Sequence, residues 1–215
     1  MAEIPERVLV EILSPRAKEG GKGEIVSTFR TIWATSNEAA KSSDLPPSLG
    51  LRVFSNVKTH PEEAGLFLFW RSMEHHDSLA ETPGFAPAAK LFGEKVVPGL
   101  ENPLDPIYLW TRQGEVALQE ATCCEVIEIQ TPGSEDVDSL DKKLATSLEN
   151  LSLGGDFVGY FYGPRNNDAT KAVVVTKWTS KSVINDSSCA QKMEQALLGV
   201  FGQGSSIEKR KQIYA

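Results

Sequence analysis

The chain has 215 residues, 40% of them hydrophobic and 24% charged, proportions of a globular protein that exclude a wholly disordered, collagenous or coiled-coil chain. Acidic residues outnumber basic ones by 29 to 22, for a net charge of -7, which disfavours nonspecific binding to nucleic acid or to an anionic membrane surface. The longest apolar run, residues 66–70, is too short to cross a bilayer, and no secretory signal is visible, so we expect a soluble cytoplasmic protein.

The first half of the sequence alternates short apolar runs with amphipathic segments. Apolar runs ended by Ser-Pro or by a polar turn are typical of strands, whereas apolar residues three and four apart predict helices. In chain order, the predicted elements are a strand at 8–13, a helix at 23–39, a hairpin of strands at 51–58 and 66–71, a short helix from Ser72 to Leu79, a second helix starting at Thr82-Pro83, and a strand at 106–111. The order βαββαβ is that of the ferredoxin-like split unit.

The second half repeats this series of elements. Written without gaps, residues 51–72 match residues 159–180, so that Trp70 falls on Trp178. An apolar stripe over residues 137–151 predicts the long helix of this half. The predicted domains are two ferredoxin-like repeats, at 1–114 and 115–215.

A single unit of this kind leaves one face of its sheet uncovered, because both helices pack on the other face. An uncovered apolar face is costly for so short a chain. Two units in one chain cover both open faces when their sheets pack together. We therefore predict an α+β fold in which two ferredoxin-like βαββαβ repeats form an intramolecular, pseudo-dimeric α/β barrel.

The segment from Phe67 to Phe85 resembles a known domain. A strand ending in Trp-x-Ser, a short helix and then Thr-Pro-x-Phe is similar to the signature of antibiotic-biosynthesis-monooxygenase-like (ABM) domains of the dimeric α/β-barrel superfamily, and residues 177–180 keep its first part. Members are usually homodimers, so the chain resembles a fused tandem pair, an arrangement familiar among filamentous-fungal proteins. The resemblance is informative about fold and weak about chemistry, because the family includes oxygenases, haem degraders, cyclases, lyases, decarboxylating enzymes and proteins without known activity.

The resemblance argues against haem degradation. Haem-degrading members carry a haem-ligand histidine on the helix that follows the short one, and the corresponding run, residues 85–90, contains no histidine. The sequence also has no Cys/His/Asp cluster at metal-ligand spacing and no glycine-rich nucleotide motif. We therefore expect no metal and no cofactor.

The candidate catalytic residues are His75, His76 and Tyr108. The two histidines follow a probable helix cap at Ser72, and His75 shares a helical face with Leu79, whereas His76 points roughly 100° away. If that face meets the sheet, a histidine there can act as general acid or base near neutral pH. The alternative is that both histidines face solvent at the start of the helix.

Large aromatic side chains gather in the first half of the sequence. Strand alternation puts Leu68 and Trp70 on one sheet face, and Tyr108 and Trp110 on one face. A space lined by aromatics with a few polar groups suits a flat apolar ligand, although the same residues can simply form the core. The candidate substrate-binding residues are Phe29, Trp33, Arg52, Phe54, Leu68, Trp70, Leu79 and Trp110.

These features predict a cofactor-independent enzyme of secondary metabolism. It would oxygenate, cyclise or isomerise an aromatic or polyketide-like small molecule in a pocket of the first repeat. Two alternatives stay open: a non-catalytic small-molecule-binding or stress-response protein, and a purely structural pseudo-dimer. The expected partner is a small apolar or aromatic ligand, without nucleic acid or membrane, and the association of two fused barrels into a homodimer is also left open.

Overall fold

A computed structural model describes residues 7–42, 48–54, 56–58, 60–82, 85–86, 90, 93–94, 106–112, 121–132, 142–144, 146–148, 156–165, 168–184 and 187–214. The chain divides into two compact units, and the first ends at Tyr108 where the second, Leu109–Tyr214, begins. The predicted repeat boundary after residue 114 falls outside the described residues and stays a prediction.

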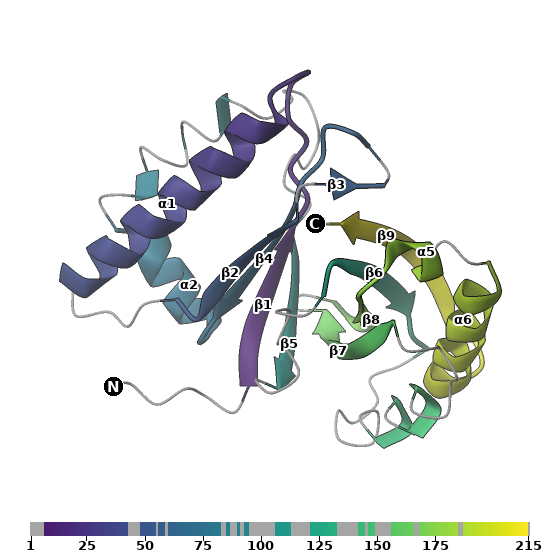
Figure 1. Ribbon diagram of the computed structural model, residues 1–215. Helices are drawn as coiled ribbons and strands as arrows, with labels where there is room; N and C mark the ends of the chain where they lie inside the picture. The colour runs from purple at the N-terminus through teal and green to yellow at the C-terminus, as the bar shows by residue number, and fades with distance from the viewer. Residues whose placement is uncertain are drawn as a thin grey trace. The chain divides into compact units, whose positions relative to one another are not determined.

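The first unit is an antiparallel sheet with helices on one face (Figure 1). Its elements are β1 (Arg7–Leu13), α1 (Lys22–Ser42), β2 (Gly50–Phe54), β3 (Asn56–Val57), β4 (Gly65–Trp70), α2 (Met73–Ala80) and the start of β5 (Ile107–Arg112). The strand order β2-β4-β1-β5 is the ferredoxin-like order. Of the strand predicted at 51–58, the described residues 51–54 and 56–57 are extended and belong to β2 and β3. The chain turns after Val57, where the His60 N–H donates to the Val57 carbonyl at 3.3 Å.

The strand register decides which side chains share a face of this sheet. Glu11 lies opposite Leu68, and Trp70 is two residues further along β4, so these three side chains lie on one face. Trp33 of α1 packs on Trp70 with ring centroids 5.4 Å apart, so this face is the one that the helices cover. The space between helices and sheet is therefore where the polar residues of this face meet α1 and α2.

The predicted helix cap at Ser72 is confirmed. The Ser72 hydroxyl accepts a hydrogen bond from the His75 backbone N–H at 3.1 Å, and α2 begins at the next residue, Met73. This cap satisfies a backbone donor that the first turn of a helix leaves free. It fixes the position of both histidines relative to β4. The start of the predicted next helix, at Pro83, lies outside the described residues.

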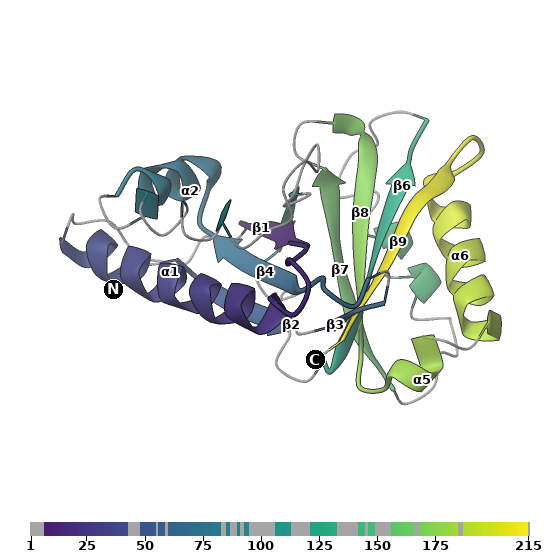
Figure 2. The same cartoon turned by 90° about the horizontal axis from the view of Figure 1, so that it is seen from above.

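The second unit has the same strand order. Its elements are β6 (Cys123–Gln130), β7 (Phe157–Arg165), β8 (Asp168–Trp178), α5 (Lys181–Ile184), α6 (Ser187–Phe201) and β9 (Ser206–Tyr214). The order β7-β8-β6-β9 corresponds strand for strand to that of the first unit, and α6 lies along its sheet (Figure 2). Of the helix predicted at 137–151, the described residues 142–144 and 146–148 are helical, and Leu144 and Leu148 are buried in the core beside α6.

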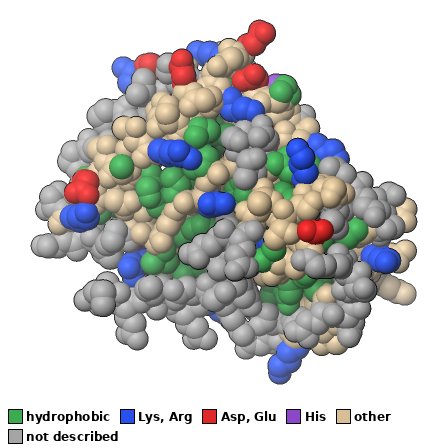
Figure 3. Space-filling view, in the orientation of Figure 1, with side chains coloured by type: hydrophobic (Ala, Val, Ile, Leu, Met, Phe, Trp, Pro, Cys, Tyr) green, Lys and Arg blue, Asp and Glu red, His purple; other side chains and the backbone are tan. Residues whose placement is uncertain are grey.

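The described charged side chains on one face of the molecule do not form a continuous stripe. On the face seen in Figure 3, Lys and Arg side chains are scattered among hydrophobic and other groups. Among the described residues, no helix combines the length and the apolar character needed to cross a membrane.

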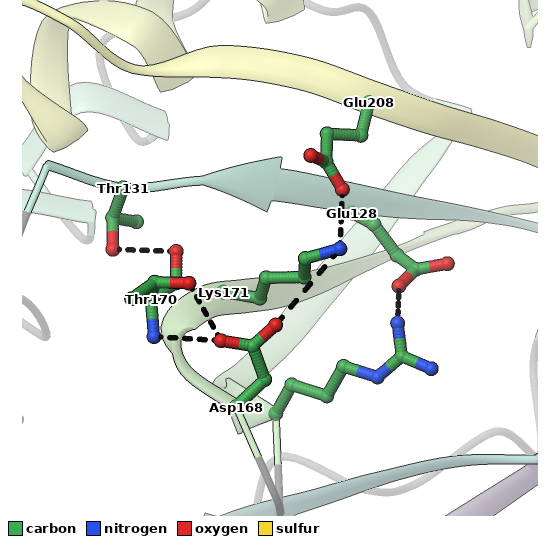
Figure 4. Close-up of polar contacts among 7 residues, drawn as sticks. Glu128, Thr131, Asp168, Thr170, Lys171 and Glu208 are labelled. Atoms are coloured by element: carbon green, nitrogen blue, oxygen red, sulfur yellow. Dashed lines mark hydrogen bonds and ion pairs between the residues drawn. The ribbon is translucent and has the colours of Figure 1, made fainter.

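Polar side chains tie the β7–β8 hairpin of the second unit to its neighbours (Figure 4). Lys171 Nζ lies 2.7 Å from Glu208 Oε2 of β9, and this contact raises the lysine pKa. Arg165 pairs with Glu128 of β6, whose side chain is only 4% exposed. The Asp168 carboxylate accepts hydrogen bonds from Thr170, which lower its pKa. The hairpin is therefore held by charge-assisted contacts to β6 and β9.

Candidate active site

A buried carboxylate lies at the centre of the helix–sheet space of the first unit. Glu11 of β1 is 6% exposed. Its Oε2 accepts a hydrogen bond from Trp70 Nε1 at 3.0 Å, and its Oε1 accepts one from the Tyr108 hydroxyl at 3.0 Å. Burying a carboxylate is costly unless donors satisfy it, so β4 and β5 supply those donors on either side of β1.

The helix α2 adds a third contact. His76 Nε2 lies 3.6 Å from Glu11 Oε2, and its Nδ1 lies 2.8 Å from Asp77 Oδ1. The His76 ring packs edge to face on the Trp70 ring, with centroids 4.9 Å apart, and edge to face on the Tyr108 ring, with centroids 5.7 Å apart. We call Glu11, Trp70, His76 and Tyr108 the Glu11 cluster. Its imidazole stands between a buried carboxylate and an exposed one.

The cluster changes the acidity of its own members. Burial lowers the pKa of His76, but the hydrogen bonds and charges of Glu11 and Asp77 outweigh burial, so the net direction is upward. Burial, and then the negative charge of Glu11, raise the pKa of Tyr108. The Tyr108 phenol therefore stays protonated as a donor at neutral pH, and the acidic neighbours of His76 favour its charged form over its neutral one relative to a free imidazole.

The two histidines have different surroundings. His75 is buried on the same helical face as Leu79, as predicted. Its Nδ1 accepts a hydrogen bond from the Arg71 backbone N–H at 3.4 Å. His76, although roughly 100° away on the helix, is the histidine that reaches the acidic groups, because helical side chains lean toward the N-terminal turn and here toward β1. The structure thus favours His76 over His75 for proton transfer.

Part of the predicted substrate-binding set surrounds the Glu11 cluster. Trp33 packs on Trp70, Phe29 is buried one helical turn before Trp33, and Leu68 lies on the same sheet face as Glu11. These residues form an apolar wall beside the carboxylate. Leu79 is buried on α2, on the side of His75.

Three predicted residues lie elsewhere. Arg52 and Phe54 pair with Phe67 and Gly65, whose side of β4 is opposite to that of Trp70, and the Arg52 guanidinium lies 5.5 Å from the Phe54 ring centroid. Trp110 belongs to the second unit. The substrate-binding role of these three residues stays a prediction.

The comparisons with known proteins concern the whole chain. No protein-family model matches the sequence, and no curated protein matches it. A "putative monooxygenase" of Lactobacillus acidophilus NCFM matches with 10% identity and a TM-score of 0.57, over 98% of this chain and 94% of that one. An "anthrone oxidase-like protein" matches with 13% identity and a TM-score of 0.53, over 98% and 92%. A "putative chlorite dismutase" matches with 7% identity and a TM-score of 0.62, over 98% and 95%.

The chain has the fold of these proteins. The match confirms the predicted α+β class with ferredoxin-like units, and it extends over both halves of one chain. At 7% to 13% identity the likeness shows the fold alone, because one fold can carry many chemistries. Information about the function therefore comes from the side chains of this chain itself.

The sequence analysis missed the residue at the centre of the cluster. Glu11 is the single charged residue in the apolar run of β1, and an ionisable side chain inside a buried strand is a functional signal when its partners are known. Asp77 was missed too, because its importance depends on the direction of the neighbouring His76 side chain. Glu11 lies outside the segment that resembles ABM domains, and Asp77 lies inside it but between the Trp-x-Ser and Thr-Pro-x-Phe motifs.

Within the described part of the chain, no group of three or more His, Cys, Asp or Glu side chains could hold a metal ion. A hollow of about 470 Å³ lies in the second unit and is lined by Lys142, Lys143, Thr146, Ser147, Gly199, Val200 and Gly202. None of these lining residues is aromatic. The hollow is therefore not the aromatic-lined pocket expected in the first repeat, and that pocket stays a prediction.

Proposed function

We propose that the protein is a monooxygenase-like enzyme that acts on an aromatic or polyketide-like small molecule by removing a proton, without a metal or organic cofactor. One observation carries the proposal: the buried Glu11 carboxylate contacts a phenol and an imidazole beside two tryptophans whose tilted rings pack on each other. Two structurally similar proteins, described as a putative monooxygenase and an anthrone oxidase-like protein, are named for oxidation reactions, which supports this proposal.

Tyr108 is the group through which the cluster would meet a substrate. Tyr108 is partly exposed, whereas Glu11 is buried. The Tyr108 oxygen accepts a proton from an activated C–H or O–H bond as its own proton passes to Glu11 Oε1 along the 3.0 Å hydrogen bond. Tyrosine is neutral before and after this step, in keeping with its raised pKa, and the net change is one proton moved from substrate to Glu11.

Dioxygen then serves as the oxidant. The substrate carbanion, delocalised over its ring and carbonyl, donates electrons to O₂, a C–O bond forms, and the peroxide takes up a proton from water, so the proton held by Glu11 has still to leave the site. Loss of water with the second hydrogen of that carbon leaves a carbonyl, so CH₂ and O₂ become C=O and H₂O. Trp33 and Trp70 would orient a flat substrate and exclude water from its carbanion. Cyclisation or isomerisation would use the same proton removal without O₂.

The direct test uses anthrone, an aromatic ketone with an acidic CH₂ group, as the probe. O₂ consumption and anthraquinone formation are measured for the wild type and for Glu11→Gln, His76→Gln and Tyr108→Phe. We expect kcat/KM to fall at least about 100-fold in each variant, the usual contribution of acid–base catalysis. His60→Gln is the matched control, because His60 lies in a turn where it accepts a hydrogen bond from the Glu62 N–H.

Two results would contradict the proposal. Wild-type turnover in Glu11→Gln and His76→Gln would remove the cluster from the reaction. Anthrone and hydroxylated anthrones that bind to the wild type but are never converted would instead support the non-catalytic binding protein. In that case fluorescence quenching of Trp33 and Trp70 by the bound ring system would persist in His76→Gln.

A further inference from the structure

His76 joins two carboxylates that differ in their access to water. Its Nε2 faces Glu11, whose side chain is 7% exposed, and its Nδ1 faces Asp77, whose side chain is 62% exposed. His76 itself is 20% exposed. The three groups therefore form a line from the interior of the first unit to its surface, with the imidazole in the middle.

A proton received by Glu11 needs such a line in order to leave. Of the groups that contact Glu11, the Trp70 indole can only donate, and Tyr108 is the group from which the proton came. His76 is the member of the Glu11 cluster that has both an acceptor nitrogen and a contact with an exposed group. Without an exit, each turnover would leave Glu11 protonated and unable to accept a second proton.

We propose that Asp77 is the positioning residue of an outward proton path, Glu11–His76–Asp77, by which the site returns the substrate proton to water. This inference rests on the proposed function, because it assigns the fate of the proton that Glu11 receives. Asp77 acts through His76 and does not touch the substrate.

The proton count of this path balances without a change in electrons. It starts with neutral His76, whose Nδ1–H donates to Asp77 and whose Nε2 carries the lone pair. The Glu11 carboxyl group, protonated on Oε1, turns about its Cγ–Cδ bond so that its O–H points to His76. The proton then moves to Nε2 once the 3.6 Å contact between Nε2 and the carboxyl oxygen closes by roughly 0.5 Å to ordinary hydrogen-bond length. The Nδ1 proton then passes through Asp77 to water, and exchange with water restores the starting tautomer. One proton leaves Glu11 and one enters the solvent.

Each group that faces His76 has a distinct part in this path. Glu11 on β1 supplies the proton, Asp77 on α2 fixes the Nδ1–H tautomer, and Tyr108 on β5 and Trp70 on β4 pack against the ring. A carboxylate on one ring nitrogen is a common device for setting the tautomer of the other. A purely structural Asp77, present only for the start of α2, would set neither the tautomer nor a pH profile.

The experiment compares Asp77→Asn, Asp77→Glu and a matched control in the full-length protein. Glu74→Gln is the control, because Glu74 is an exposed acid on the same helix and in its first turn. NMR of the imidazole side chains follows the titration of His76, with His60 and His75 as internal references. Anthrone turnover is measured as a function of pH in parallel.

Asp77→Asn is expected to change both the pH dependence of kcat and its maximum value. The acid limb of the kcat profile moves to lower pH, because His76 loses a carboxylate that favours its charged form. The plateau of kcat falls about tenfold, part of the 100-fold or larger contribution of acid–base catalysis, because the outer acceptor is gone. Asp77→Glu restores both toward the wild type, and Glu74→Gln changes neither.

The failures of the two proposals can be told apart. An unshifted His76 titration in Asp77→Asn, or a wild-type plateau of kcat, overturns the proton path while the oxygenase activity stands. A wild type that converts no anthrone overturns the proposed function, and the NMR titration still decides whether Asp77 controls His76. Equal shifts in Asp77→Asn and Glu74→Gln would reduce Asp77 to general surface charge and also overturn the path.

Discussion

At the scale of single residues, Glu11 is a charge that the sheet buries and then satisfies. Removing a carboxylate from water costs several kcal/mol, and hydrogen bonds to charged groups return about 1.5–3 kcal/mol each. The donors from Trp70 and Tyr108 and the ion pair with His76 together offset that cost. A core of this kind gains little stability over a wholly apolar one, so stability alone does not account for the buried carboxylate.

The contact between His76 and the two carboxylates should make stability depend on pH. Because the folded-state pKa of His76 is raised above its ordinary value, the stabilising contribution is fully present below the unfolded pKa of about 6.5 and is lost as pH rises through the folded pKa. We therefore expect His76→Gln to destabilise the protein more at pH 5.5 than at pH 8.5. Urea denaturation of wild type and variant at both pH values measures this difference.

The control for this measurement is His60→Gln, which removes a histidine from a turn outside the cluster. Its effect on the free energy of unfolding should change less between the two pH values. If the His76→Gln difference is the same at pH 5.5 and 8.5, the ion pair with Glu11 does not exist in solution.

At the scale of elements, the helix start at Ser72 and the strand alternation could be predicted because they depend on neighbours in sequence. Ser72 caps the turn that follows it, and alternation correctly grouped Leu68 with Trp70. The Glu11 cluster could not be predicted, because its hydrogen bonds join residues 59 and 97 positions apart. Those contacts depend on the register of strand pairing, which also puts Arg52 on the other face of the sheet.

The backbones of β5 and β7 lie very close together at Gly163 in the second unit. A Cβ added at Gly163 of β7 would lie 1.9 Å from the Trp110 carbonyl oxygen of β5, and a backbone atom cannot move aside as a flexible side chain can. We expect Gly163→Ala to destabilise the protein by about 1–3 kcal/mol or more, the cost of overpacking. Thermal and urea denaturation measure the loss.

The same substitution at Gly199 provides the matched control. Gly199 lies in α6, and a Cβ there would meet nothing within 4 Å. Alanine favours a helix over glycine by up to about 1 kcal/mol, so Gly199→Ala should be neutral or stabilising. Effects of the same sign and size at both positions would show that the contact with Trp110 is not what requires Gly163.

At the scale of the whole molecule, the two units share a plan but differ at the corresponding positions. Trp70 lies opposite Leu9, and Trp178 lies opposite Cys123, so Glu125 occupies in β6 the place of Glu11 in β1. Glu125 accepts a hydrogen bond from Gln212 Nε2, and the Trp178 indole donates to Thr176 instead of to the carboxylate. In the gap-free match of the two halves, Ile184 takes the place of His76, and the second unit contains no histidine.

This difference predicts that only one half of the molecule carries out proton transfer. Glu11 and Glu125 are both buried, at 6% and 3% exposure, so replacing either with Gln is a similar change in the core. We expect Glu11→Gln to lower kcat for anthrone at least about 100-fold, because His76 then has no carboxylate from which to take a proton. Glu125→Gln should leave kcat within about twofold, since its surroundings offer no imidazole.

Steady-state kinetics, with denaturation curves to confirm that both variants fold, separate the cases. Equal loss of kcat in both variants would mean that the second unit contributes to the reaction and that the missing histidine does not distinguish the halves.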